Sequence, residues 1–365
     1  MSVSTGAVLN ALKSFPDPYM PKPDLVARGA IKDLHVDGGK VSFVVVLGYP
    51  AAGIQEQLIN DIKACVMAVD GVDAVELSLD WGIVANKTQN NMESMYRIKN
   101  IVAIASGKGG VGKSTTTINL ALSLAKEGAR VGVLDADIYG PSQPMMLGID
   151  EGTRPEFIDE KHFKPIDKHG IQSMSMGYMV TDKTPMVWRG PMVSGALQQL
   201  LSQCMWNDLD YLLIDMPPGT GDIQLTLSQK VPVTGAVIVT TPQDIALLDA
   251  QKGIEMFRKV DIPVLGVVEN MAVHICSNCG HQEHLFGEGG GKRIAEDYHS
   301  ELLGALPLDL SIREGTDKGE PTLVSDPDGE IAQIYRSIAR KVAANLAAKG
   351  KNEANPPVQM IVTDA

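Results

Sequence analysis

The chain of 365 residues lacks any run of 18 or more apolar residues, so we expect no transmembrane helix. Its first residues lack a basic segment followed by an apolar core, and we therefore expect no secretory signal peptide. Four cysteines are too few for a disulfide scaffold, which favours the reducing cytoplasm. A basic excess is also missing, because the formal net charge is −12. Non-specific binding to nucleic acid or to an anionic membrane is therefore not expected.

Residues 1–84 have the pattern of a small α+β domain. Asp37-Gly38-Gly39 separates two apolar alternations, which is a hairpin signal. The predicted order is helix, two strands, helix and strand, over residues 8–12, 30–36, 40–48, 54–69 and 72–79. Residues 85–98 are rich in Asn and Gln and lack a clear periodicity, so we interpret them as a linker.

From residue 99 to about 350 the chain alternates between strand and helix patterns. Several strand patterns are continuously apolar, as in parallel strands covered by helices on both faces. Strands are predicted at residues 101–105, 131–134, 211–214, 236–240 and 264–268, and helices at 113–126, 193–204, 223–230, 245–260 and 331–346. The expected architecture is α/β, a doubly wound, mostly parallel sheet with its site at the carboxyl ends of the strands. Residues 351–365 form a tail.

One glycine-rich loop stands between the first of these strands and the first of these helices. Its sequence fits G-x-x-x-x-G-K-[ST], whose glycines let backbone N–H groups surround a phosphate. We expect Lys113 to reach the β- and γ-phosphates of a nucleotide and Ser114 to ligate Mg²⁺. The predicted nucleotide-binding residues of the loop are Gly107, Lys108, Gly109, Gly110, Val111, Gly112, Lys113, Ser114 and Thr115.

Two acidic segments follow neighbouring strand patterns. Asp215 ends one strand and precedes a Pro-Pro-Gly-Thr-Gly turn, and a carboxylate at such a place holds Mg²⁺ directly or through water. Asp135 and Asp137 follow another strand, where one carboxylate can position the attacking water. Together with the phosphate loop, these residues predict an NTPase, with Lys113, Asp137 and Asp215 among its catalytic residues.

Lys108 is an additional lysine on the glycine-rich arc, five residues before Lys113. Its simplest interpretation is a solvated loop residue. The functional interpretation is a second cation for the phosphates, including those of a partner subunit. In that case it acts in trans as an arginine finger does.

A second cluster of candidate ligands lies at Cys276-Ser-Asn-Cys279-Gly-His281-Gln-Glu-His284. Two thiolates do not complete a tetrahedral site by themselves. Two copies in a symmetric dimer supply four thiolates, which suits an Fe₄S₄ cluster or zinc. Alternatively, His281 and His284 join the cysteines in one chain as a zinc site, or the cysteines form a redox disulfide. A pair without any metal or redox role is the remaining option.

Several motifs together resemble one family. The loop resembles the deviant Walker A motif of MinD/ParA-type ATPases, in which Lys108 matches the signature lysine. Other segments narrow the resemblance to the Mrp/ApbC iron–sulfur cluster carrier ATPases, over residues 99–345. These segments lie at residues 135–142, 188–191, 215–222, 270–271, 276–279 and 286–291. Residues 5–82 resemble the MIP18-like domain that often precedes the ATPase.

The resemblance implies a homodimer that binds ATP, hydrolyses it slowly, and holds a labile Fe₄S₄ cluster between subunits. Cluster donor proteins and apo-proteins that receive the cluster are the implied partners. By position, Asp137 matches the switch I aspartate, Asp215 the Walker B aspartate and Asn270 an asparagine that contacts adenine. Cys276 and Cys279 match the bridging cluster ligands.

One departure concerns the small domain, where many relatives carry a cysteine in a Pro-Ala-Cys-Pro type loop. Residues 49–53 read Tyr-Pro-Ala-Ala-Gly, so this domain is expected to serve in docking rather than as a thiol ligand. Three rival functions remain open at this point: a positioning or partitioning ATPase, an electron-donating iron protein, and a P-loop ATPase stapled by zinc.

Overall fold

The structure is a computed structural model that describes residues 3–89, 92, 95, 97–138, 140–179, 190–276 and 278–349. For residues 190–194 it describes the backbone alone. Two compact units make up the chain: residues up to 86 together with the end of the chain from 343, and residues 87–342. Part of the predicted linker, residues 188–189 of the motif set and the tail lie outside the described residues. The predicted domain boundaries therefore stay predictions.

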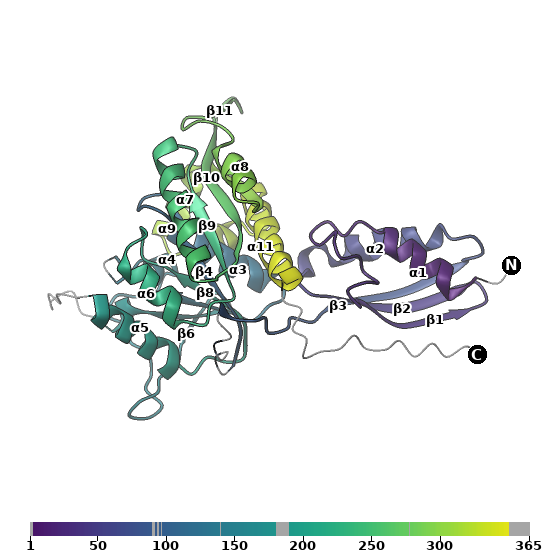
Figure 1. The fold of residues 1–365 in the computed structure, drawn as a ribbon, viewed down its shortest axis with the longest axis horizontal. Coiled ribbons are helices and arrows are strands. Elements are labelled where there is room, and N and C mark those ends of the chain that lie inside the picture. Colours follow the sequence, from purple (N-terminus) through teal and green to yellow (C-terminus); the bar gives the residue numbers. More distant parts are fainter. Residues whose placement is uncertain are drawn as a thin grey trace. The chain divides into compact units, whose positions relative to one another are not determined.

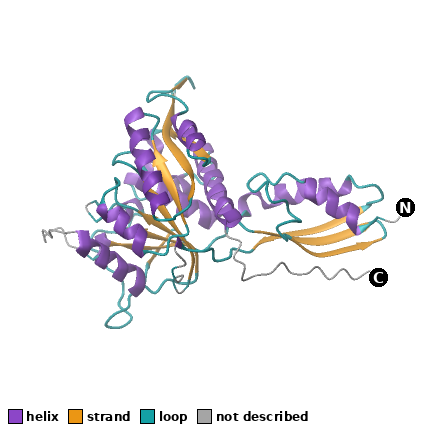
Figure 2. Ribbon diagram, in the orientation of Figure 1, coloured by secondary structure: helices purple, strands orange, loops and turns teal. Residues whose placement is uncertain are grey.

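The first unit is a three-stranded sheet with two α-helices, in the predicted order (Figure 2). Its elements are α1 (Thr5–Ser14), β1 (Ile31–Asp37), β2 (Lys40–Leu47), η1 (Ala52–Ile54), α2 (Gln55–Met67) and β3 (Ala74–Trp81). The sheet order is β1-β2-β3, with β1 antiparallel and β3 parallel to β2. Asp37 pairs with Lys40, so the hairpin turn lies at Gly38-Gly39 as predicted.

The second unit contains a nine-stranded sheet with helices (Figure 1). Its path is β11-β10-β9-β4-β8-β5-β7-β6, and β12 pairs with β10. The strands are β4 (Ile98–Ala105), β5 (Val131–Asp135), β6 (Ile166–Lys168), β7 (Ile171–Ser175), β8 (Leu209–Asp215), β9 (Gly235–Thr240), β10 (Val264–Ile275), β11 (Gln282–Glu283) and β12 (Leu302–Leu308). All pairs are parallel except β6 with β7 and β10 with β11. The prediction of a mostly parallel α/β sheet is confirmed.

The helices that lie between these strands or follow the last of them include the five that the sequence predicts. They are α3 (Lys113–Lys126), α4 (Gln143–Met146), η3 (Met176–Tyr178), α5 (Gly190–Gln203), α6 (Asp222–Lys230), α7 (Asp244–Lys259), α8 (Gly290–Asp297), α9 (Leu310–Asp317), α10 (Thr322–Ser325) and α11 (Glu330–Lys349). Among the described residues, none of these helices combines the length and apolar character that crossing a membrane requires.

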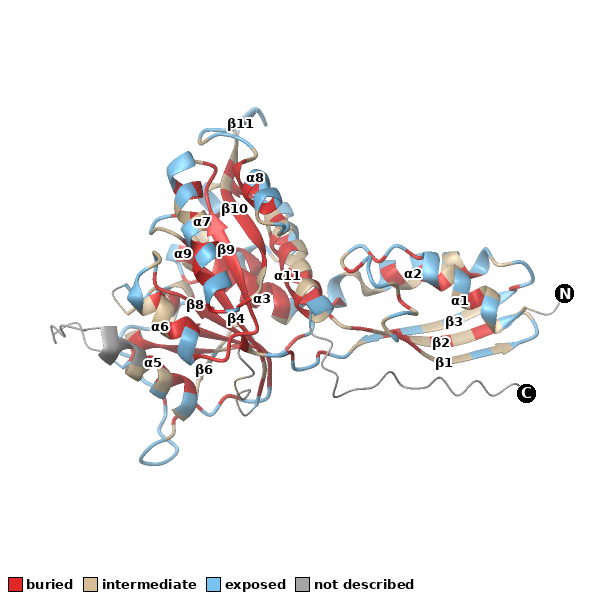
Figure 3. Cartoon of the chain, in the orientation of Figure 1, coloured by how far each residue is buried: buried red, intermediate tan, exposed pale blue. Residues whose placement is uncertain are grey.

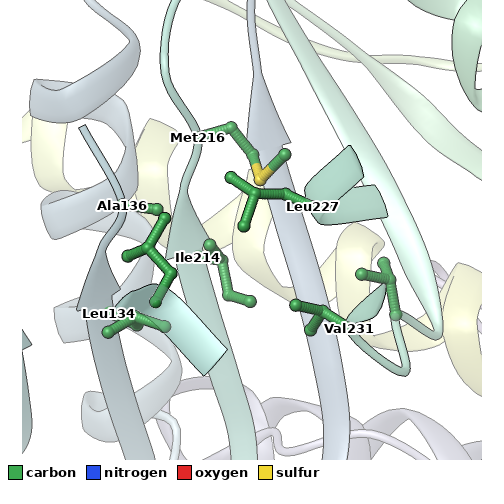
Figure 4. Close-up of a pocket in the computed structure, with 8 residues that line it drawn as sticks. Leu134, Ala136, Ile214, Met216, Leu227 and Val231 are labelled. Atoms are coloured by element: carbon green, nitrogen blue, oxygen red, sulfur yellow. The ribbon is translucent and has the colours of Figure 1, made fainter. Parts of the chain in front are cut away.

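Burial explains why the central strands are continuously apolar. Every residue of β5, β8 and β9 is buried, as Figure 3 shows for the middle of the sheet. Figure 4 shows an apolar pocket where α5 and α6 meet β5 and β8. It is lined by Leu134, Ala136, Leu197, Ile214, Met216, Leu227, Val231 and Val233. Since no polar side chain lines it, we interpret it as core packing rather than a ligand site.

Candidate functional site

The glycine-rich loop joins β4 to α3, as predicted. Gly110 and Gly112 both have φ of +81°, a conformation that favours glycine. At Gly107 a Cβ atom would lie 2.1 Å from the backbone carbonyl carbon of Asp249 in α7. The loop is therefore held close to α7, and only glycine fits at residue 107 without a shift of backbone. Gly112 is the N-cap of α3 and supplies no side-chain cap, so the positive end of the helix faces the loop.

Lys113 and Asp215 form a buried ion pair at the base of this loop. The Nζ atom of Lys113 lies 2.5 Å from Oδ1 of Asp215 and 3.1 Å from the hydroxyl oxygen of Ser114. The side chains are 6% and 0% exposed. The Ser114 hydroxyl and the Asp215 carboxylate thus both lie next to the Lys113 ammonium. Oxygen donors of this kind fit Mg²⁺, and phosphate oxygens fit the lysine.

Asp135 is fully buried on the strand beside Asp215, and the two residues pair across β5 and β8. Its carboxylate accepts hydrogen bonds from the N–H groups of Asp137, Ser142 and Gln143 at 3.0 to 3.1 Å. Burial and the nearby Asp215 raise the pKa of Asp135 to about 7. Asp135 therefore organises the segment that follows β5. Asp137 is half-buried and is the more accessible of the two carboxylates.

Gln143 is a residue of this site that the sequence analysis missed. It begins α4 and is 1% exposed. Its Nε2 atom donates to Oδ2 of Asp215 at 2.9 Å and to the carbonyl oxygen of Ser114 at 3.1 Å. Only its place just after Ser142 in the acidic segment could have drawn attention to it, because glutamine carries no charge or motif of its own.

The turn after Asp215 lies against the glycine-rich loop. The N–H group of Gly219 donates to the carbonyl oxygen of Ser106 at 3.0 Å, and the Ser106 hydroxyl donates to the carbonyl oxygen of Lys108 at 2.9 Å. Within the described part of the chain, the Lys108 ammonium forms no hydrogen bond or ion pair, and the side chain is half-exposed. Its action on phosphates stays a prediction.

Asn270 contacts the same loop from β10. Its Nδ2 atom donates to the carbonyl oxygen of Val111 at 2.9 Å, and a Cβ atom on Gly112 would lie 2.1 Å from that nitrogen. The structure therefore places Asn270 under the phosphate loop, whereas its predicted contact with adenine stays a prediction. The preceding residue, Glu269, is buried and accepts a hydrogen bond from the N–H group of Gly291 in α8.

Cys276 and Cys279 lie on a small hairpin at the far end of β10 (Figure 1). The N–H group of Cys276 donates to the carbonyl oxygen of His281 at 2.9 Å, and that of Gly280 donates to the carbonyl oxygen of Cys276 at 2.8 Å. N–H groups of Asn278 and Cys279 that face the Cys276 thiol lower its pKa. Both thiols are free, and Cys279 is exposed. This arrangement favours a thiolate and fits an iron or zinc centre that completes its ligands elsewhere.

The two histidines do not complete such a centre within the chain. His284 directs its Nδ1 atom at the carbonyl oxygen of Ala272, 2.8 Å away, and therefore donates a hydrogen bond there. His281 is exposed. No group of three or more His, Cys, Asp or Glu side chains that could hold a metal ion occurs among the described residues. The alternative of a zinc site within one chain is thus not assembled in this structure.

A comparison with protein-family models decides the family. The model described as NUBPL iron-transfer P-loop NTPase matches residues 97–343. The chain belongs to this family. A second model, described as iron-sulfur cluster assembly protein, matches residues 5–77. Both parts of the resemblance seen in the sequence are confirmed, and the family supports nucleotide hydrolysis in general.

Curated relatives carry matching names. An iron-sulfur cluster carrier protein of Pseudomonas fragi is 64% identical over 278 residues, which cover 76% of this chain and 97% of that protein. The protein of the same name from Escherichia coli (strain K12) is 57% identical over 296 residues, 81% of this chain and 80% of that protein. The iron-sulfur cluster transfer protein NUBPL of Mus musculus is 50% identical over 251 residues, 68% of this chain and 78% of that protein.

Solved structures share the fold of the second unit. A nucleotide-binding protein from Archaeoglobus fulgidus, solved in complex with ADP, has a TM-score of 0.57 and 37% identity. The match covers 66% of this chain and 93% of that chain. The cell division ATPase MinD of Pyrococcus furiosus has a TM-score of 0.51 and 23% identity, over 67% of this chain and 98% of that chain, which shows the fold alone.

Proposed function

We propose that this protein is an ATP-binding and slowly hydrolysing carrier that holds a labile Fe₄S₄ cluster between two subunits and transfers it to apo-proteins. One observation carries the proposal. The strand β10 bears Asn270, which is hydrogen-bonded to the phosphate loop, and Cys276, the first of the two thiols, directly follows its last residue, Ile275. A change in the loop can therefore reach the thiols through one hydrogen bond and a short length of backbone. The names of the relatives and the family support the same function.

ATP binds with its phosphates on residues 107–115 in this account. Lys113 would then bind phosphate oxygens in place of the Asp215 carboxylate, and that carboxylate and the Ser114 hydroxyl would hold Mg²⁺. When bound, Mg²⁺ neutralises charge on the phosphates. Asp137 orients the water that attacks the γ-phosphorus, and ADP and phosphate are the products. The ammonium of Lys108 stabilises negative charge on the nucleotide of the opposite subunit.

The backbone of β10 changes course between the two sites. Met271 has φ of +56°, and the pairing of β10 with β12 is irregular between Glu269 and Val273. A methionine in the left-handed region costs about 1–2 kcal/mol, so its neighbours must enforce this conformation. The side chains of the two preceding residues, Glu269 and Asn270, are both bonded outside the strand. We infer that Met271 is the point at which a shift of the loop alters the direction of the Cys276 hairpin.

Each chain supplies the two thiols of the hairpin, Cys276 and Cys279, and a four-iron cluster takes four thiolate ligands. Two copies of the hairpin would therefore make one site, and we propose on this ground that the carrier is a homodimer. A cluster held between subunits by exposed hairpins can be handed to an acceptor that offers its own thiolates. The remaining proposed partners are cluster donor proteins and apo-proteins in the cytoplasm. We do not expect nucleic acid or membrane among the partners.

Anaerobic reconstitution with iron and sulfide tests this function. The dimer is expected to take up four irons per two chains and to give the Mössbauer spectrum of an Fe₄S₄ cluster. Cys276→Ala and Cys279→Ala are each expected to abolish the cluster, whereas Cys204→Ala is the control, because Cys204 is a buried core residue. A full cluster in Cys276→Ala would overturn the assignment. Zinc in protein purified without oxygen, with no capacity to take up iron, would favour the zinc-stapled ATPase instead.

A further inference from the structure

Gln143 connects the two buried aspartates of the site. Its backbone N–H group donates to Oδ2 of Asp135 at 3.1 Å, and its side-chain Nε2 atom donates to Oδ2 of Asp215 at 2.9 Å. The same Nε2 atom donates to the carbonyl oxygen of Ser114, the predicted Mg²⁺ ligand, at 3.1 Å. One residue therefore ties the segment after β5 to the end of β8 and to the start of α3.

The orientation of this amide follows from its partners. Both groups that face Nε2 are acceptors, a carboxylate and a backbone carbonyl. A flipped amide would place its oxygen against two oxygens, so the amide nitrogen must face them. The Oε1 atom then points elsewhere, and it is buried without a hydrogen-bond partner among the described residues. A buried carbonyl oxygen in that state is unfavourable.

We propose that Gln143 is a positioning residue of the magnesium–nucleotide site: its Nε2 orients the carboxylate of Asp215 and links it to the backbone of Ser114. This inference rests on the proposed function, because it needs ATP and Mg²⁺ at the phosphate loop. The Nε2 atom contacts one predicted Mg²⁺ ligand, the Asp215 carboxylate, and the backbone of the other, Ser114. Gln143 therefore holds the two predicted ligands in a fixed position relative to each other.

The neutral amide suits this place for an electrostatic reason. Asp135 and Asp215 are both buried, and Lys113 is the cation bonded to Asp215. A third carboxylate here would add charge repulsion in a site of low dielectric constant. A glutamine instead donates to the existing carboxylate without adding charge.

Equilibrium binding of a fluorescent ATP analogue, measured with Mg²⁺ and again with EDTA, tests the inference. The variants are Gln143→Ala and Gln143→Met, of which the second keeps most of the side-chain volume. In Mg²⁺ both are expected to raise Kd about tenfold, as the loss of one or two hydrogen bonds implies. In EDTA, Kd is expected to stay within about twofold of wild type. Gln172→Ala is the matched control, because Gln172 in β7 bonds to the backbone of Asn207, in the loop before β8.

Three results would contradict the account in different ways. If both variants keep the wild-type Kd in Mg²⁺, Gln143 has no positioning role. If both raise Kd equally in Mg²⁺ and in EDTA, the residue supports the fold of the site and not the metal, which also overturns the inference. If wild-type protein itself binds the ATP analogue no better with Mg²⁺ than with EDTA, the proposed function fails at the nucleotide site.

Discussion

The Nδ2 atom of Asn270 donates a hydrogen bond to the carbonyl oxygen of Val111 at 2.9 Å. This contact joins β10 to the phosphate loop, although the two residues are far apart in sequence. It matters because β10 continues into the hairpin that carries Cys276. One strand thus leads from the nucleotide site to the thiol site, and the left-handed Met271 lies between them.

Asn270→Ala is expected to weaken ATP binding about tenfold, because the Val111 carbonyl oxygen loses its donor inside the protein. A titration with a fluorescent ATP analogue measures the effect. Asn207→Ala serves as the control, since Asn207 is exposed and belongs to a different loop. An unchanged affinity in Asn270→Ala would mean that this bond does not hold the loop in its binding conformation.

Two glycines of the loop are expected to differ in their effect on stability when each is replaced by alanine. Gly107→Ala is expected to lower the free energy of unfolding by about 1–3 kcal/mol, because its Cβ atom would meet the backbone of Asp249. Gly109→Ala is expected to change it by less than about 0.5 kcal/mol, because Gly109 is exposed and its nearest neighbour is Pro218 at 3.9 Å. Urea denaturation of both variants measures the difference. Equal effects would show that α7 does not confine the loop at residue 107.

Removal of Lys113 is expected to destabilise the protein as well as to abolish nucleotide binding. Lys113→Ala leaves the buried carboxylate of Asp215 without its cation, which costs about 3–5 kcal/mol. Adding Asp215→Asn to this variant should restore part of the stability, since the unpaired charge disappears. Denaturant unfolding of the two single variants and the double variant gives the coupling energy.

The matched control for that cycle is the exposed ion pair of Lys164 with Glu156. Its loss in Lys164→Ala is expected to cost less than about 1 kcal/mol, because water screens both charges. A stability loss in Lys113→Ala no larger than in Lys164→Ala would contradict the importance of the buried pair.

The thiols provide a prediction of pH dependence. N–H groups that face the Cys276 sulfur favour its thiolate and lower its pKa, whereas burial raises the pKa of the Cys204 thiol. Alkylation requires the thiolate. In the apo-protein, Cys276 should therefore react with iodoacetamide at lower pH than a free cysteine does, and Cys204 should react slowest. Mass spectrometry of digests across a pH series measures both rates. In urea the two rates should converge, and a Cys276 profile equal in native and unfolded protein would contradict the account.

The sequence predicts the central strands well, because burial on both faces leaves a continuous apolar signal, as in β8 and β9. It missed β6, β7, β11 and β12. Residues 171–175 contain three polar side chains, and β12 contains a glycine and a proline, which weaken a strand pattern. The proline is tolerated at 307 because β12 pairs on one side, with β10.

The sequence likewise predicts some residues of the candidate site and misses others. Lys113, Ser114 and Asp215 were predicted to converge because carboxyl ends of parallel strands meet at one edge of the sheet, and they do. Gln143 was missed because its role depends on the path of the chain after β5. The contact between Asn270 and Val111 was missed for the same reason: it joins distant segments, and no local pattern marks it.

The central claim is that the phosphate loop controls the thiol site through β10. The most direct measurement is the rate of cluster transfer from the reconstituted dimer to an apo-acceptor under anaerobic conditions, with saturating MgATP and without nucleotide. In wild-type protein the two rates should differ several-fold. In Asn270→Ala, at ATP concentrations that saturate the weakened site, the difference should disappear while the cluster content stays normal. Equal rates with and without MgATP in wild-type protein would contradict the claim.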